Sequence, residues 1–267
     1  MNEDLGEFVW HELMTTDLEA ARGFYGQVLG WAFEPMGTPD QPYLIVSVAG
    51  TGIGGMMTMP PEACAQGARP GWVGYVGVDD VDAAGHRFAQ GGGKLLKPAQ
   101  DIPGVGRFAV VADPHGASLV LFRGRDGLAR TPLPPGTPGT VGWNELHSGD
   151  QPKATPFYGA QFGWIPIQAM DMGPMGVYQI YGLPGRAVNG GTPKMLGGMM
   201  TKTPEMPTPP MWLYYFNVDD IDAALERAQS GGARILMGPH QVPGGNWVVQ
   251  ALDPQQAWFA LVGPRRN

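Results

Sequence analysis

The sequence contains a single cysteine, Cys64, so no disulfide bond can form within the chain. Its neighbours in "PPEACAQGA" include no lysine, arginine or histidine that would stabilise a thiolate, and we expect an unreactive thiol. Charged residues make up only 15% of the chain, and the net charge of −7 is not offset by any local cluster of Lys and Arg. A surface of this sign repels the phosphates of nucleic acids and of anionic lipids, so neither is expected as a partner.

Long apolar runs are missing as well. No stretch of about 20 apolar residues could span a bilayer, and the acidic start "MNEDLGEF" does not resemble a secretory signal. We therefore expect a cytoplasmic protein without a membrane partner. The chain is rich instead in glycine (42) and proline (27) beside 43% hydrophobic residues, which is typical of packed domains with many turns. Its 267 residues suffice for two domains of roughly 130 residues each.

The chain repeats itself. The segment "WHELMTTDLEAARGFYGQVLGW", which begins at Trp10, returns as "WNELHSGDQPKATPFYGAQFGW" from Trp143. The motifs "GGMM" (54–57) and "VDDVDAA" (78–84) return at 197–200 and, as "VDDIDAA", at 218–224. The sequence therefore predicts a tandem duplication, with a first copy at 1–123 and a second at 141–267. Residues 124–140, "GRDGLARTPLPPGTPGT", are dense in Pro and Gly and predict a linker outside the sheets.

Each copy shows the same order of strand and helix signals. In the first copy an alternating run at 8–15 is followed by a helical pattern that begins near Asp17 and stops at Gly30, then by three short strand-like runs. The order returns after residue 71, with a helix beginning near Asp80. Two βαβββ units are therefore predicted per copy. In the second copy Pro152 and Pro156 predict a first helix that is shorter or starts later than its counterpart.

A βαβββ unit with an Asp after its first strand, "FY" in the helix, "LGW" at the helix end and "DPHGA" before the last strand resembles the vicinal oxygen chelate superfamily. That superfamily includes glyoxalases, bleomycin-resistance proteins and extradiol dioxygenases. The segments "WHELMTTD", "FYGQVLGW" and "DPHGASLVLF" are most similar to a tandem-domain branch labelled hydroxylases or glyoxalase-like proteins of antibiotic pathways. The resemblance implies an α+β fold with two tandem glyoxalase-like domains, whose four βαβββ units form two half-open barrels around cups for a small organic molecule. The sequence leaves open which units pair and what the oligomeric state is.

The resemblance also implies where a metal would be held, because members of the superfamily take their ligands from the first and last strands of paired units. The corresponding positions here are Trp10, Val73, Trp143, Leu213, Val120 and Ala260, and the matching strands of the other two units read "GIGGMMTM" and "LGGMMT". A metal site needs several converging His, Glu or Gln side chains, and these positions offer none. We therefore expect no metal and no other cofactor.

Alternation along the strands places Trp143, Glu145 and His147 on one face, and Trp10, Glu12 and Met14 on the equivalent face of the first copy. These positions provide the candidate catalytic residues, which are Glu12, Glu145 and His147. A hydrogen-bonded Glu and His in a cup could transfer protons. A buried polar pair that only satisfies its own hydrogen bonds is the alternative.

A glutamate on an apolar interior face needs a compensating partner, since desolvation raises the free energy of its charged form. The candidates are Arg107 or the backbone for Glu12, and His147, Asn144 or the backbone for Glu145. Whether the two glutamates close the barrel ends structurally or contact a ligand is not decided by the sequence.

Methionine and aromatic side chains are the expected pocket lining, because Met adapts its shape and Trp or Tyr offers flat apolar area with a polar edge. The candidate ligand-binding residues are Trp10, Met14, Met56, Trp72, Tyr75, Trp143, Met199, Trp212 and Tyr215. Ordinary core packing is the competing interpretation for these side chains. The favoured function is a module that binds a small apolar or aromatic metabolite in metal-free cups. The alternative is an enzyme of the lyase, hydroxylase or dioxygenase type, either metal-free through Glu12 or Glu145 and His147, or metal-dependent.

Overall fold

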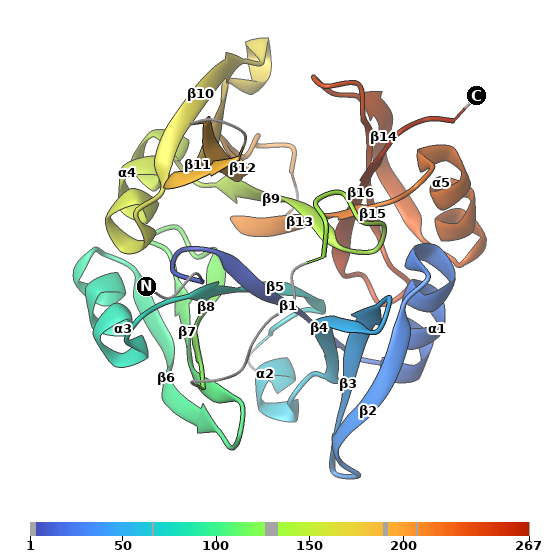
Figure 1. The fold of residues 1–267 in the computed structure, drawn as a ribbon, viewed down its shortest axis with the longest axis horizontal. Helices are drawn as coiled ribbons and strands as arrows, with labels where there is room; N and C mark the ends of the chain where they lie inside the picture. The colour runs from blue at the N-terminus through green and yellow to red at the C-terminus, as the bar shows by residue number, and fades with distance from the viewer. Residues whose placement is uncertain (1–3, 66, 126–132, 189–191, 207, 267) are drawn as a thin grey trace. The chain divides into compact units, whose positions relative to one another are not determined.

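The computed structural model describes residues 4–65, 67–125, 133–188, 192–206 and 208–266. The first copy contains β1 (Phe8–Thr15), α1 (Leu18–Leu29), β2 (Ala32–Thr38), β3 (Gln41–Val48), β4 (Thr51–Thr58), α2 (Pro61–Ala65), β5 (Gly71–Gly77), α3 (Val81–Gln90), β6 (Lys94–Ile102), β7 (Gly106–Ala112) and β8 (Ser118–Gly124). The second contains β9 (Val141–Ser148), α4 (Gln151–Phe162), β10 (Ile165–Asp171), the 3-10 helix η1 (Gly173–Met175), β11 (Val177–Val188), β12 (Thr192–Thr201), β13 (Met211–Asn217), α5 (Ile221–Ser230), β14 (Arg234–Gln241), β15 (Trp247–Leu252) and β16 (Trp258–Gly263). The four βαβββ units of an α+β fold are thus present (Figure 1).

The strands form two mixed sheets of eight. Their orders are β2-β3-β4-β1-β5-β8-β7-β6 and β10-β11-β12-β9-β13-β16-β15-β14. Within each unit the first strand pairs in parallel with the last, as β1 does with β4 and β9 with β12, and the remaining pairs within a unit are antiparallel. Neither sheet closes on itself, which confirms the expected half-open barrels. Each sheet contains both βαβββ units of one copy. The sequence left open which βαβββ units pair in this way.

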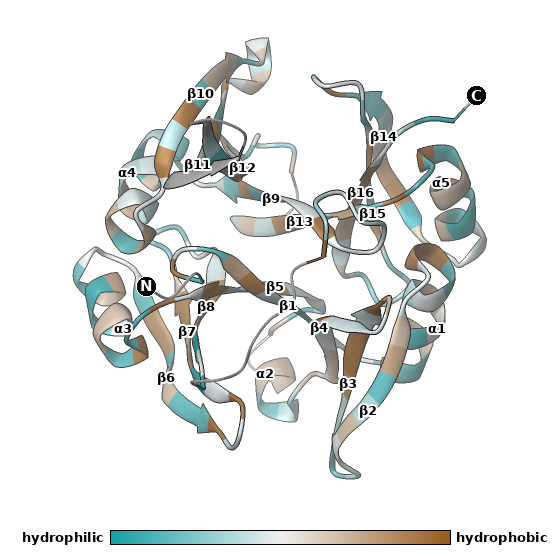
Figure 2. Ribbon diagram, in the orientation of Figure 1, coloured by the Kyte–Doolittle hydropathy of each residue, from teal (hydrophilic) through white to brown (hydrophobic). Residues whose placement is uncertain are grey.

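Each of the four main helices has an aspartate as its N-cap. Asp17, Asp80, Asp150 and Asp220 each accept a hydrogen bond from a backbone N–H of the first turn, which would otherwise lack a partner. Helices α3 and α5 carry both hydrophobic and hydrophilic residues along their length (Figure 2), and they bury the hydrophobic ones. None of the helices in the described part of the chain has the length and hydropathy that a membrane span requires.

Helix α4 differs from the expectation. It has 12 residues, as many as α1, so the prediction of a shorter or later helix was wrong. Pro152 lies in the first turn, where a backbone N–H has no partner inside the helix, and its fixed φ suits that position. Pro156 lies inside the helix and removes one interior hydrogen bond, yet the helix, capped by Asp150, continues past it.

The contacts of the chain define two compact units, each of which contains residues of both copies. The α3/α4 unit comprises residues up to Val9, those from Gly74 into the linker, and Trp143–Trp212. The α1/α5 unit comprises Trp10–Val73, the end of the linker, and the residues from Leu213 onward. Helix α1 packs beside α5, and α3 beside α4 (Figure 1). Residues 126–132 of the expected linker lie outside the described part, and residues 133–140 form turns and no strand.

Each compact unit contains a buried chain of hydrogen bonds from Trp to Tyr to Asp, which we call an aromatic relay, and each relay joins the two copies. In the α1/α5 unit Trp72 Nε1 donates to the Tyr25 hydroxyl (3.0 Å), which donates to Asp253 (3.0 Å). In the α3/α4 unit Trp212 Nε1, the Tyr158 hydroxyl and Asp113 repeat this relay at 3.2 Å for each bond. The Tyr of "FY" in one copy therefore binds the Asp of "DP" in the other.

Candidate functional site

Glu12 lies at the centre of a hydrogen-bonded cluster in the first copy. Its side chain is on β1, and the residue is only 8% exposed. The Tyr43 hydroxyl, from β3, donates to Glu12 Oε2 over 2.9 Å and accepts from Trp10 Nε1 over 3.1 Å. Burial, and after it the charge of Glu12, raises the pKa of Tyr43 far above its usual value, so the hydroxyl keeps its proton and donates a hydrogen bond to the carboxylate.

The second copy builds the same cluster. Trp143 Nε1 donates to the Tyr178 hydroxyl (2.8 Å), which in turn donates to Glu145 Oε2 (2.7 Å). The other carboxylate oxygen, Oε1, lies 2.6 Å from His147 Nε2. Both glutamates are therefore compensated by a tyrosine hydroxyl, and Glu145 by a histidine in addition. The histidine was among the expected partners, whereas neither tyrosine was considered from the sequence.

The other expected partners are engaged elsewhere. Arg107 forms ion pairs of 2.8 Å with Asp82 and with Asp101 on the surface of its own unit. Asn144 Nδ2 donates to the backbone carbonyl of Leu196 (2.8 Å). Of the two partners expected for Glu12, Arg107 or the backbone, Arg107 is thus engaged elsewhere, and the Tyr43 hydroxyl binds the Glu12 carboxylate.

The repeated "GGMM" motif provides the space for these tyrosines. Tyr43 on β3 reaches Glu12 on β1 by crossing β4, and the β4 residue paired with Glu12 is Gly55. A Cβ on Gly55 would overlap the Tyr43 hydroxyl. In the second copy Gly198 pairs with Glu145, and a Cβ there would overlap the ring of Tyr178. The second glycine of each motif is thus needed for the close approach of a ring to the strand.

The pairing of neighbouring strands places the tyrosine of each cluster in a row of four side chains on one face of the sheet. Directly paired residues of neighbouring strands point to the same face. The row of the first copy is Met36, Tyr43, Met57 and Met14. The row of the second copy is Met170, Tyr178, Met200 and His147. The two rows match at three positions, and His147 stands where the first copy has Met14.

His147 differs from the other row members in burial. The residue is 2% exposed, while the tyrosines and the methionines are half-buried or exposed. Its Nε2 is engaged by Glu145, but Nδ1 has no hydrogen-bond partner within the described residues. A buried imidazole nitrogen without a partner is uncommon, since it forfeits its hydrogen bond to water without a replacement.

The remaining candidate ligand-binding residues occupy other positions. Met56 and Met199 alternate with the row residues Met57 and Met200, so they point to the opposite face, where both are fully buried. The structure thus places them in the core. Trp72 and Trp212, likewise buried, belong to the aromatic relays described above.

Two further candidates are buried tyrosines on the fifth strand of each copy. The Tyr75 ring makes an edge contact with Phe122, with 5.9 Å between the ring centroids. The Tyr215 hydroxyl accepts a hydrogen bond from Gln250 Nε2 (2.7 Å), which lies on β15 of the same βαβββ unit.

Within the described residues, no group of three or more His, Cys, Asp and Glu side chains lies close enough to hold an ion. Glu145 and His147 supply two donors, and they are bonded to each other. A resident divalent ion requires more converging ligands than this pair.

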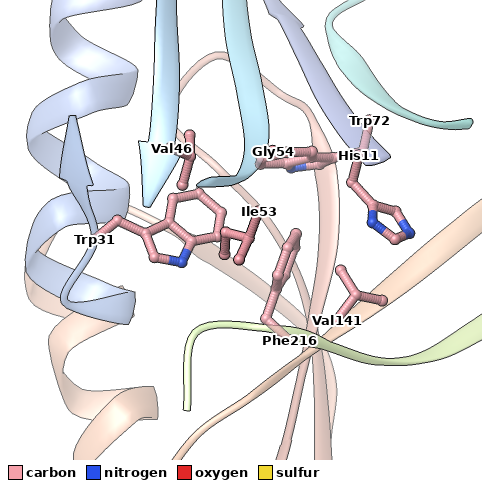
Figure 3. Close-up of a pocket in the computed structure, with 8 residues that line it drawn as sticks. All are labelled: His11, Trp31, Val46, Ile53, Gly54, Trp72, Val141 and Phe216. Atoms are coloured by element: carbon pink, nitrogen blue, oxygen red, sulfur yellow. The ribbon is translucent and has the colours of Figure 1, made fainter. Parts of the chain in front are cut away.

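A small cavity lies in the α1/α5 unit, on the face of β1 opposite to Glu12. His11, Trp31 and Phe216 are among its lining residues, and Figure 3 shows these rings turned toward a shared space. Its volume is about 10 Å³, which is at the limit for one water molecule, so it offers no room for an organic ligand. A groove of about 140 Å³ lies in the α3/α4 unit between α3 and β6, lined by residues such as His86 and Leu95.

A family model and several known proteins are similar to this chain over most of its length. The model of the Glyoxalase/Bleomycin resistance protein/Dioxygenase superfamily matches residues 7–121 and 140–261. The protein named "Putative glyoxylase CFP32" of Mycobacterium tuberculosis is 32% identical over 257 residues, which cover 96% of this chain and 94% of that protein. The anthracycline biosynthesis protein DnrV of Streptomyces peucetius is 30% identical over 274 residues, covering 98% and 94%.

Solved structures share the fold at lower identity. The Mn(II)-bound glyoxalase from Novosphingobium aromaticivorans has a TM-score of 0.61 at 15% identity, covering 98% of this chain and 83% of that one. A variant of homoprotocatechuate 2,3-dioxygenase from B. fuscum, in complex with HPCA, has a TM-score of 0.65 at 15% identity, covering 98% and 72%.

Proposed function

Because this chain belongs to the Glyoxalase/Bleomycin resistance protein/Dioxygenase superfamily, we propose that it binds a small apolar or aromatic organic molecule against the methionine and tyrosine rows of its two sheets. The observation that carries the proposal is the cluster of Trp, Tyr and Glu, built with the same hydrogen bonds in both copies. Each cluster lies beside methionines on one sheet face. In this arrangement Trp10 and Trp143 have a binding role.

The composition of the rows suits an aromatic ligand. Thioethers make favourable contacts with aromatic rings, and their flexible side chains adapt to the outline of the molecule. The carboxylate and hydroxyl beside them supply the few polar groups that orient a ligand in a mostly apolar site. The name of DnrV, which places that relative in the biosynthesis of anthracyclines, agrees with an aromatic ligand.

The proposal is tested by titrating a panel of aromatic compounds into the protein by calorimetry. Replacing a row methionine, as in Met57→Ser or Met200→Ser, should weaken binding about tenfold, because it removes apolar contact area. The matched control is Met195→Ser, which changes an exposed methionine outside both rows. Equal affinities of all three variants and the wild type would rule out the rows as the binding face.

A second candidate function is proton transfer without a metal, favoured by the 2.6 Å contact between Glu145 and His147. A Glu and His pair of this kind acts as an acid and base on carbonyl or phenolic substrates. If it does so here, Glu145→Gln should abolish turnover while ligand binding persists. Elemental analysis of protein purified without chelator is the necessary control, since one equivalent of metal per copy, lost together with activity on dialysis, would restore a metal-dependent reaction.

A further inference from the structure

The two rows are equivalent except at one position. This difference determines which hydrogen-bonding group a ligand must provide. Met14 in the first copy is a thioether, which has no hydrogen bond to satisfy. His147 in the second copy has two ring nitrogens, of which only Nε2 has a partner within the described residues. The copies are therefore matched in shape and polarity along three positions and differ in hydrogen-bonding capacity at the fourth.

The surroundings of Glu145 determine the role of each nitrogen of His147. The carboxylate accepts from Tyr178 through one oxygen and faces His147 Nε2 with the other. Because a carboxylate can only accept, Nε2 carries the hydrogen. In the neutral ring the lone pair is then on Nδ1, which is an acceptor awaiting a donor.

We propose that the site of the second copy, and not that of the first, recognises an aromatic hydroxyl group, which donates a hydrogen bond to His147 Nδ1. The ligand class is thus a phenol, and His147 determines this specificity. The inference rests on the proposed function, since it names the ligand chemistry at one of the two binding faces. A phenol fits both features of the row: its ring contacts the methionines, and its hydroxyl satisfies the buried nitrogen.

Access to Nδ1 requires a movable neighbour, because His147 is almost fully buried. Met200 is the residue paired with His147 on β12, and its side chain is half-buried. An unbranched thioether side chain changes rotamer at little cost. A ligand can therefore displace a methionine and reach the imidazole.

The test compares 2-naphthol with 2-methoxynaphthalene, which match in ring size but differ in the hydroxyl hydrogen. By calorimetry the second site of the wild-type protein should bind 2-naphthol about tenfold more tightly, the ratio expected when one compound leaves a buried acceptor unsatisfied, whereas the first site should bind both compounds equally. His147→Met, which gives the second row the residue of the first, should remove this preference and retain binding of 2-methoxynaphthalene. The matched control is Met14→Leu in the first copy, which should keep the preference.

A direct readout is the ¹⁵N resonance of His147 Nδ1, assigned by through-bond NMR correlations in the isotope-labelled wild-type protein. It should shift on addition of 2-naphthol and stay in place with 2-methoxynaphthalene. This measurement on the wild-type protein decides the matter even if the variant does not fold.

The outcomes separate the two claims. Equal binding of both compounds, a preference that survives in His147→Met, or a resonance that ignores 2-naphthol would overturn the role of His147 and leave the proposed function standing. Failure of both compounds to bind would overturn both. A stoichiometric metal ion on Nδ1 of the purified protein would also overturn the inference, because the acceptor would already be occupied.

Discussion

The hydroxyl groups of Tyr43 and Tyr178 each accept one hydrogen bond and donate another inside a cluster that is largely shielded from water. Tyr43→Phe removes both bonds at once and leaves the ring in place. We expect the free energy of unfolding to fall by about 1–3 kcal/mol, the range for removing a partner from buried polar groups. Urea unfolding provides the measurement.

A double-mutant cycle with Glu12→Gln provides the control for Tyr43→Phe. The two residues are in direct contact, so their effects on unfolding free energy should not add. Strictly additive effects would show that the hydrogen bond between them contributes nothing.

Asp253 leads to a prediction about pH. Burial raises the pKa of its carboxyl group, while hydrogen bonds from Ala257, Tyr25 and Gln255 act in the opposite direction. A raised pKa means that the folded state holds the proton to higher pH than the unfolded state. The stability that this group contributes is therefore greatest below its ordinary pKa of 3.8, and it is lost as the pH rises through the folded value.

The comparison that isolates Asp253 is with Asp253→Asn. The difference in unfolding free energy between wild type and variant should shrink as the pH rises from about 3.5 to 7, since the other carboxyl groups are common to both proteins. A difference that grows with pH would contradict the raised pKa. Unfolding in urea at several pH values measures it.

Among the strands, the passage of a tyrosine ring across β4 and across β12 depends on glycine. Gly55→Ala and Gly198→Ala should each displace a tyrosine ring, lower the unfolding free energy by about 1–3 kcal/mol and weaken ligand binding, because the added Cβ overlaps the ring. Gly23→Ala is the matched control. Its Cβ on helix α1 would meet nothing within 4 Å, so this variant should gain about 0.5–1 kcal/mol.

Thermal unfolding and the calorimetric titration together test this pair of expectations. If Gly55→Ala is as stable as the control and binds ligand as tightly, the position of the Tyr43 ring across β4 contributes to neither stability nor binding.

For the chain as a whole, the boundaries 1–123, 124–140 and 141–267 describe the repeat, and we propose them as domain boundaries. Neither copy completes a compact unit, because the aromatic relays join Tyr25 to Asp253 and Tyr158 to Asp113. Trp164 of the second copy also donates to the carbonyl of Gly6 in the first, and Trp31 donates to the carbonyl of Gly139 in the linker.

Expressed alone, residues 1–123 should therefore be unfolded or self-associate, since a second copy of the same segment offers an equivalent Asp. Mixing with residues 141–267 should restore a cooperative thermal transition. Sedimentation and calorimetry test this, and a folded monomer of either segment would contradict it.

Features that depend on near neighbours in the chain could be predicted without the structure. The repeat indicated the number of units, the Asp caps marked the helix starts, and alternation placed Glu145 and His147 on one face. Pro156 shows the limit of local rules, since α4 keeps its full length of 12 residues around this proline.

Contacts between residues far apart in the chain became known only from the folded molecule. Tyr43 is separated from Glu12 by a helix and a strand, and their contact depends on sheet register and on a glycine whose purpose no local pattern reveals. The same holds for the relays between copies and for the unsatisfied nitrogen of His147. Strand alternation and capping act over a few residues, whereas burial and hydrogen-bond partners are set by the packing of the whole chain.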